Sequence, residues 1–267
     1  MTAINTNVGA LMSRTSAKIA DGKMQTHMRR LSTGLRINSA ADDAAGLAVA
    51  HKLNSQLKGI NMGIRNSTDA ISLLKTAEAG QATAINLALR MKEIAVQMSN
   101  GIYTAADRTN AEVEMTALGA SITALSGNTL FNSDVLLDGT FSENMRTGDS
   151  TAETVAVAID DADIYVATFT VSSTTAAATT ATNLDAAIAT LSTSQAEVGA
   201  LINRLQFNVD NLSQASVIAE EAMGNIKDTD YAKETSELAK QQILNQAATS
   251  MLAQANQSKQ SVLALLQ

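Results

Sequence analysis

The feature that most constrains this chain is an apolar seam that repeats in alternating steps of three and four residues. Such heptad spacing is typical of a helix that packs along its whole length against other helices. Over residues 183–226 it predicts one helix of roughly 65 Å at ~1.5 Å per residue, which needs partners of similar length. The seam consists of Ile188, Leu191, Gln195, Val198, Ile202, Leu205, Val209, Leu212, Ser216, Ala219, Met223 and Ile226.

The partners of this helix are three upstream segments, 44–78, 82–99 and 105–126, which carry the same spacing. We expect them to form an elongated helical bundle with the long helix. Asn100 and Gly101 predict a helix stop, and Thr104 or Asp107 is expected to cap the next helix. The apolar positions in these segments are Leu57, Ile60, Ile64, Ile71, Leu74, Leu87, Met91, Ile94, Met98, Met115, Leu118, Ile122 and Leu125.

The segment between the helices, about 127–183, loses helical spacing and is rich in turn residues. Residues 154–159 and 164–171 are β-branched and aromatic, so they predict two strands joined by a hairpin loop at 160–163. Residues 172–182, SSTTAAATTAT, are expected to form a return strand or loop. A two-stranded hairpin is stable only against a larger core, so we expect this one to pack on the bundle.

Both chain ends carry thin amphipathic stripes. Because isolated helices depend on tertiary packing of their apolar face, we expect these ends to be mobile in the monomer and ordered only when neighbouring copies cover them. The stripes are therefore the predicted polymerisation surface. Its residues are Ile4, Val8, Leu11, Met28, Leu31, Leu252, Ala255, Val262 and Leu266.

Composition excludes several classes of protein. The chain has no Cys, only two His and a net charge of −7. A disulfide framework, a thiolate metal site and a basic nucleic-acid footprint are therefore excluded. No window has the roughly 18 consecutive apolar residues of a membrane span. The first twenty residues also lack the apolar core of a signal peptide, so we expect no membrane insertion and export without a cleaved signal peptide.

No catalytic constellation is present in the sequence. The carboxylate clusters at Glu220 and Glu221 and at residues 160–163 lack a partnered base or nucleophile. Residues 38–43 could form a Ca²⁺ loop, but they lack alternating oxygen ligands, so Ser39 or Asp42 as a helix cap is favoured. We predict no enzyme, no cofactor and no metal site.

Longer motifs at both ends identify a family resemblance. They include AINTNV at 3–8, RLSTGLRINSAADDAAGLA at 30–48 and TLFN at 129–132. Downstream, LLDG stands at 136–139, DTDYA at 228–232 and MLAQANQ at 251–257. With these motifs, the chain resembles bacterial flagellin over about 1–139 and 184–267.

This resemblance implies a mainly α fold with a terminal antiparallel coiled coil, a helical bundle and a small β-hairpin. The implied domains are 1–40 with 227–267 as the filament core, 41–139 with 184–226 as the bundle, and 140–183 as a short variable outer segment. The implied function is that of an exported structural subunit that polymerises into the extracellular flagellar filament and gives motility. Its implied partners are further copies of itself, an export chaperone, the filament cap and hook-associated proteins.

The resemblance also implies two surfaces. The spoke segment, with Arg36, Asn38, Asp42 and Asp43, would contact neighbouring subunits. Arg90, Ile94, Gln97 and Glu114 match the surface of flagellins that toll-like receptor five of animal hosts recognises. From residue types alone, Arg90 and Glu93 are a solvated ion pair on the polar face of a helix.

Two other functions remain open from the sequence. A hook–filament junction protein shares the terminal helical design, although the outer region here is short. A cytoplasmic helical signalling scaffold of the chemoreceptor kind is also heptad-patterned and cysteine-poor, but the predicted hairpin argues against it. Seeded polymerisation separates the three, because only a filament subunit extends fragments.

Overall fold

The computed structural model describes residues 6–150, 152–164 and 169–264, with side chains as far as Ser258. The chain divides into two compact units, one of Met1–Ser55 with Ile218–Gln267 and the other of Gln56–Val217. The described residues are mainly helical, as predicted. The helices are α1 (Val8–Thr33), α2 (Ala44–Met98), α3 (Ala105–Asn128), α4 (Thr174–Lys227) and α5 (Tyr231–Ala264).

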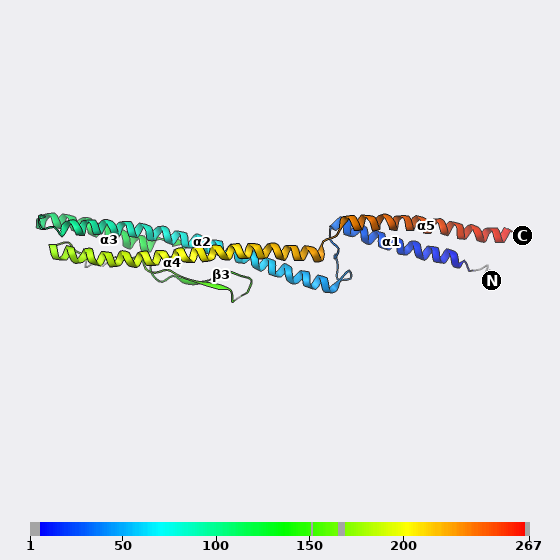
Figure 1. The fold of residues 1–267 in the computed structure, drawn as a ribbon, viewed down its shortest axis with the longest axis horizontal. Coiled ribbons are helices and arrows are strands. Elements are labelled where there is room, and N and C mark those ends of the chain that lie inside the picture. Colours follow the sequence, from blue (N-terminus) through cyan, green and yellow to red (C-terminus); the bar gives the residue numbers. More distant parts are fainter. Residues whose placement is uncertain (1–5, 151, 165–168, 265–267) are drawn as a thin grey trace. The chain divides into compact units, whose positions relative to one another are not determined.

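The unit of residues 56–217, called the bundle below, is built on three helices that run side by side (Figure 1). Helices α2 and α4 are antiparallel, since contacts pair early residues of one with late residues of the other. The Gln81 amide donates to Ser194 Oγ at 2.9 Å, and the Asn208 amide donates to Ser67 Oγ at 3.3 Å. Helix α3 folds back on α2, where Arg90 pairs with Glu114 at 2.8 Å.

Helix α2 is one continuous helix of 55 residues. The predicted division into 44–78 and 82–99 was therefore wrong. Gly80 lies inside the helix and does not end it. A Cβ at this position would stand only 2.5 Å from Leu137 Cδ1, so glycine is needed there to let the chain after α3 approach α2 closely. A helical glycine costs about 1 kcal/mol relative to alanine, which the packing of a long helix readily offsets.

The turn between α2 and α3 lies at the predicted helix stop. Thr104 is the N-cap of α3, and with Asp107 it forms a reciprocal capping box, as the sequence indicated. Arg108, buried beneath the turn, donates to the carbonyls of Met98, Asn100 and Tyr103 at 2.9–3.0 Å. This guanidinium satisfies carbonyls that the end of α2 leaves without helical partners.

The β-hairpin is present, but its strands are paired differently from the prediction. Strand β4 (Thr154–Ala158) pairs antiparallel with β3 (Ser142–Arg146), with Met145 opposite Val155. A second, smaller hairpin joins β1 (Leu130–Phe131) and β2 (Asp134–Val135).

The predicted second strand, 164–171, was wrong for its described residues: Ile164 and 169–171 are not in a strand, and 165–168 lie outside the described residues. Phe169 and Val171 instead pack as a loop into the core formed with α2, α3 and α4. Val155 and Val157 of β4 fill the neighbouring core. The apolar pattern therefore predicted burial correctly, although it did not identify the partner strand.

Helix α4 begins at Thr174, nine residues before the predicted start at 183. The expected loop or return strand at 172–182 was therefore wrong over most of its length. Ser173 Oγ accepts from the backbone N–H of Ala176, as an N-cap serine does. The alanine-rich run that follows favours a helix, and Ala177 and Thr180 are buried.

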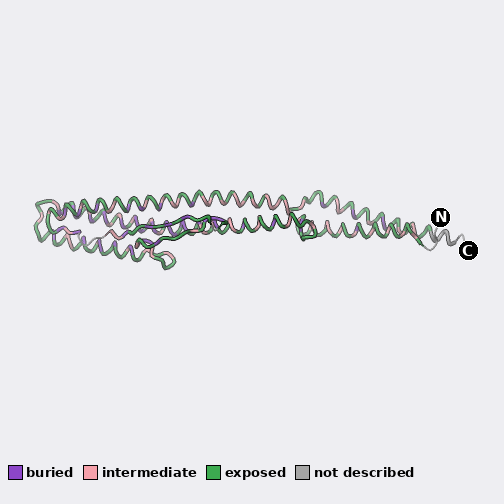
Figure 2. Tube along the Cα trace, turned by 90° about the horizontal axis from the view of Figure 1, so that it is seen from below, coloured by how far each residue is buried: buried purple, intermediate pink, exposed green. Residues whose placement is uncertain are grey.

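The core of the bundle contains part of the predicted seam, since Leu191, Val198 and Leu205 are buried and Ile202 and Val209 pack against them, and it contains many of the apolar positions predicted upstream. Buried residues, purple in Figure 2, gather in the helices and hairpin of this unit. One position is shifted, because Ser194 and not Gln195 faces inward. The confirmed core residues include Leu74, Met91, Ile94, Met98, Met115, Ile122, Leu191, Val198 and Leu205.

Candidate self-association surface

The other unit is dominated by α1 and α5, which lie against each other (Figure 1). The pair is antiparallel, since Asn7 contacts Ala255, and Asn245 contacts Ala17. On α5 the buried positions are Glu234, Gln241 and Ala248, one heptad apart. On α1 only Ala20 is buried. The side chains at the centre of this terminal coiled coil are thus small or polar.

Several large apolar side chains of α1 and α5 face solvent instead. In α1, Leu11 is 61% exposed and Met28 54%; in α5, Ile243 is 65% exposed and Met251 61%. Figure 2 shows both helices mainly in the colours of exposed and intermediate residues. Groups of exposed apolar side chains often mark interaction surfaces. The exposed set is Val8, Leu11, Met12, Ile19, Met28, Ile243, Leu244 and Met251, called the outer apolar face below.

The predicted polymerisation residues divide into three groups. Val8, Leu11 and Met28 belong to the outer apolar face. Leu31, Leu252 and Ala255 are half-buried. Ile4 and Leu266 lie outside the described residues, and Val262 lies in the part of α5 whose side chains are not described.

A charged cluster joins the two helices near the start of α5. One carboxylate oxygen of Glu234 accepts from Arg30 Nη1 at 3.1 Å, and the other is hydrogen bonded to His27 Nδ1. Burial raises the pKa of Glu234, but the hydrogen bonds and charges of His27 and Arg30 outweigh this and hold it below its usual value. Sequence reasoning missed this cluster. The available signal was the heptad spacing of Glu234 ahead of Gln241 and Ala248.

A short bridge closes the base of the coiled coil. Leu35 pairs with Asp228, and the Arg36 backbone N–H donates to the Lys227 carbonyl at 2.7 Å. The Arg36 guanidinium also donates to the Ile226 carbonyl at 2.6 Å. Gly34 adopts φ of +71° at the C-cap of α1, where glycine is strongly favoured. Predicted spoke residue Arg36 is therefore engaged within its own chain.

The remaining spoke residues organise the approach to α2. Asp42 accepts from the backbone N–H groups of Asn38 and Ser39, and from Ser39 Oγ at 3.0 Å. The Ser39 hydroxyl, followed by the Asn38 N–H, holds the pKa of Asp42 below its usual value. Asp43 accepts from the Gly46 N–H and thereby caps α2, a role we had predicted for Ser39 or Asp42.

The receptor-matching residues lie on one face of α2 and α3, except for one. Arg90 bonds both Glu114 and Glu93, and these partners raise the pKa of the guanidinium further. Gln97 donates to the Tyr103 hydroxyl at 3.1 Å. Ile94, however, is only 2% exposed and lies in the core. It can support such a surface from below but cannot touch a partner there.

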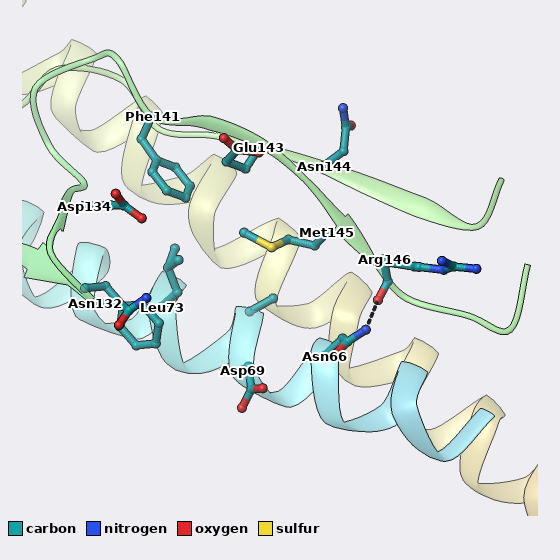
Figure 3. A pocket seen from close by; sticks show the side chains of 12 residues that line it. Asn66, Asp69, Leu73, Asn132, Asp134, Phe141, Glu143, Asn144, Met145 and Arg146 are labelled. Atoms are coloured by element: carbon teal, nitrogen blue, oxygen red, sulfur yellow. Dashed lines mark hydrogen bonds between the residues drawn. The ribbon is translucent and has the colours of Figure 1, made fainter. Parts of the chain in front are cut away.

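A shallow cavity of about 300 Å³ lies between α2 and the two hairpins (Figure 3). Its apolar lining includes Leu73 and Met145, and Asp69, Asp134 and Glu143 stand around it. Among the described residues, no group of three or more His, Asp or Glu side chains is arranged to hold a metal ion. The lining residues of the cavity include three carboxylates but no histidine.

Within the described residues, none of the helices combines the length and apolarity that a membrane crossing requires.

Comparison with known proteins identifies the family. Residues 4–142 match the bacterial flagellin N-terminal helical region, and residues 181–266 match the bacterial flagellin C-terminal helical region. The chain is 36% identical to a flagellin of Halalkalibacterium halodurans over 269 residues, covering 98% of this chain and 99% of that one. It is also 36% identical to Bacillus subtilis flagellin over 301 residues, covering 98% and 99%.

Among solved structures, the crystal structure of Bacillus cereus flagellin is similar with a TM-score of 0.52 and 32% identity. The match covers 59% of this chain and 94% of that one. The sequence matches at both ends of the chain show that it belongs to the bacterial flagellin family, whose members are structural subunits of the flagellar filament and not enzymes.

Proposed function

We propose that this chain assembles into its filament through the outer apolar face of α1 and α5. The observation that carries the proposal is the division of side chains in the terminal coiled coil: alanine and polar groups lie inside, while Leu11, Met28 and Met251 face solvent. Burying apolar area contributes about 25 cal/mol per Å². In a free chain this contribution is unused, and neighbouring copies supply it.

The proposed assembly unit is residues 1–40 with 227–267. Few apolar side chains are buried within it, so its pairing is weak in isolation and is completed when the unit docks at a filament end. The entropy cost of ordering the ends is then offset only at that place. Because the docking surface and its acceptor are different surfaces, repetition gives an open helical polymer.

The remaining division of the chain follows from this role. We assign residues 41–139 with 184–226 to a second domain, which contains the helices of the bundle, and 140–183 to its outer segment. Spoke residues Asn38, Asp42 and Asp43 lie in a polar, hydrogen-bonded turn, and we assign them contacts with adjacent subunits. Arg36 supports these contacts by holding the turn to Ile226.

The exposed apolar side chains at the chain ends also need to be covered by a chaperone before assembly. We assign the chain an export chaperone that covers the outer apolar face, export through the flagellar apparatus without a cleaved signal peptide, and assembly against the filament cap and hook-associated proteins. The physical support is that an uncovered apolar face at high concentration promotes aggregation.

We further propose that the face around Arg90 is recognised by toll-like receptor five of animal hosts. Arg90, Gln97 and Glu114 are exposed there, and Ile94 supports them from the core. The test is an Arg90→Ala/Glu114→Ala variant in reporter cells that carry the receptor. Signalling equal to that of the unsubstituted chain would overturn the assignment.

The assembly proposal is tested by seeded elongation of purified chain, followed by electron microscopy. The intact chain is expected to extend fragments of its own filament into long filaments. A version limited to residues 41–226 should remain helical but fail to extend them. An intact chain that stays monomeric with its own seeds would favour a junction protein over a filament subunit.

A further inference from the structure

Among the described residues, the terminal coiled coil has few fully buried apolar side chains that could select one alignment of its helices. Its buried apolar side chains, among the described residues, are Ala20 and Ala248. Alanine side chains are small, so they discriminate weakly between alternative alignments of the two helices. In coiled coils of this kind, polar groups at inward positions set register and partner choice.

The inward polar group that differs from all the others is Glu234. It is 8% exposed, and its two oxygens are divided between His27 and Arg30, which lie about one helical turn apart on the facing helix. Moving α5 by a heptad would place this carboxylate opposite Ala20 and Lys23 in one direction and opposite Gly34 and Ile37 in the other, so it would lose its paired contacts and Arg30 would lose its carboxylate partner. A buried charge without a partner is strongly destabilising, although a satisfied one adds little over an apolar pair.

Arg30 strengthens this selectivity because Glu234 is the carboxylate that its guanidinium contacts. Its Nε is buried and has no hydrogen-bond partner among the described atoms. The guanidinium therefore depends on Glu234 for its charge compensation within the seam. The charged groups that face Glu234 across the interface are His27 and Arg30, whereas Glu237, one turn further along α5, pairs with Lys240 on its own helix.

We propose that Glu234 is the specificity-determining residue for pairing of the two chain ends: its buried carboxylate recognises His27 and Arg30 together and so selects the antiparallel alignment of α1 with α5. The bridge at Leu35 and Asp228 tethers the base of the pair, and Glu234 selects which helix face of α1 meets α5 above it. This inference rests on the proposed function in one respect, namely that the aligned pair is the form that enters the filament.

The absence of cysteine from the chain allows a clean test of this alignment. A Cβ at Gly9 would stand 3.6 Å from the Cβ of Ala255, within the range of a disulfide. A Gly9→Cys/Ala255→Cys chain should therefore form an intrachain disulfide when α1 and α5 are aligned. Formation is measured in redox buffer on the full chain, both free and after seeding, by mobility in non-reducing gels.

Charge variants in this chain then test Glu234. Glu234→Lys places a cation against His27 and Arg30 and is expected to lower the disulfide yield by at least about tenfold. Adding Arg30→Glu restores an opposite-charge pair and should return the yield to within about threefold of the parent. The matched control is Glu237→Lys, a half-buried glutamate one turn along the same helix whose partner is Lys240 on α5 itself, which should change the yield by less than about twofold.

Three results would overturn the proposal. These are no disulfide in the parent in either state, a yield unaffected by Glu234→Lys, or a loss that the charge exchange does not restore. The last result would mean that Glu234 supports the fold without selecting a partner. Seeded elongation of the unsubstituted chain is scored separately, so failure of the assembly role and failure of the pairing role give different outcomes.

Discussion

In the bundle of residues 56–217, the inward positions hold large apolar side chains, whereas in the terminal coiled coil they hold alanine, glutamine and a charged cluster. Leu74 and Leu205 are fully buried in the bundle, while Leu11 and Met251, of similar size, face solvent at the chain ends. Burying a leucine contributes about 1.5–3 kcal/mol. Large apolar side chains therefore stabilise the monomer in the bundle, whereas those exposed in the terminal coiled coil are, by our proposal, buried only against neighbouring copies.

The largest expected effect comes from removing matched leucines from the two units. Leu74→Ala should lower the free energy of unfolding by about 2–5 kcal/mol, since it opens a cavity in a packed core. Leu11→Ala should change it by less than about 0.5 kcal/mol, because the side chain is already in solvent. Urea denaturation followed by circular dichroism measures both. Equal losses would show that the terminal coiled coil stabilises the monomer as the bundle does.

Polar substitution of the outer apolar face should separate assembly from folding. Leu11→Asp/Met28→Asp is expected to reduce the rate of seeded elongation by about tenfold or more, because the interface would bury unpaired charges. The unfolding midpoint should stay at the parent value. A matched double substitution on the exposed surface of the bundle, Ile102→Asp/Val113→Asp, serves as control for added charge. Unchanged elongation in the α1 variant would remove the outer apolar face as the assembly surface.

The two N-caps offer a smaller, direct comparison. Thr104→Ala removes the cap of α3 and should cost about 1 kcal/mol of the bundle's stability. Asn7 caps α1 and also donates to the Ala255 carbonyl. If α1 adds little to monomer stability, Asn7→Ala should cost less than about 0.5 kcal/mol. Thermal unfolding of the two variants in parallel decides this; a larger loss for Asn7→Ala would contradict the weak-pairing account.

The smallest effects concern two aspartates, one in each unit. The Ser39 hydroxyl lowers the pKa of Asp42, and the Thr104 hydroxyl lowers that of Asp107. Because both folded pKa values are depressed, each contact stabilises its turn above the unfolded pKa and is lost as pH falls through the folded value. Carbon-detected NMR titration should show Ser39→Ala raising the pKa of Asp42 alone and Thr104→Ala raising that of Asp107 alone. A shift in both would mean that the turns are coupled.

Much of the bundle could be predicted from periodicity, because its seam combines the right spacing with large side chains. The partner of strand β4 could not. Residues 142–146, SENMR, have little strand character, whereas the apolar run after residue 163 has much. Strand propensity is local, but pairing depends on which segment can cover the core while satisfying its backbone. Phe169 and Val171 were buried without joining a sheet.

By itself, the sequence determined the helical class, the long α4, a cap at Thr104 or Asp107 and, through its terminal motifs, the family. Only the tertiary structure decided which face of α1 and α5 lies inside. Val8 and Leu11 form one three-residue step, and Ala17 and Ala20 form another. Spacing therefore allows either pair to face the partner helix, and side-chain size favours the wrong one. Contact with a second helix settles the choice, and it places Glu234 between His27 and Arg30, a relation that no local pattern contains.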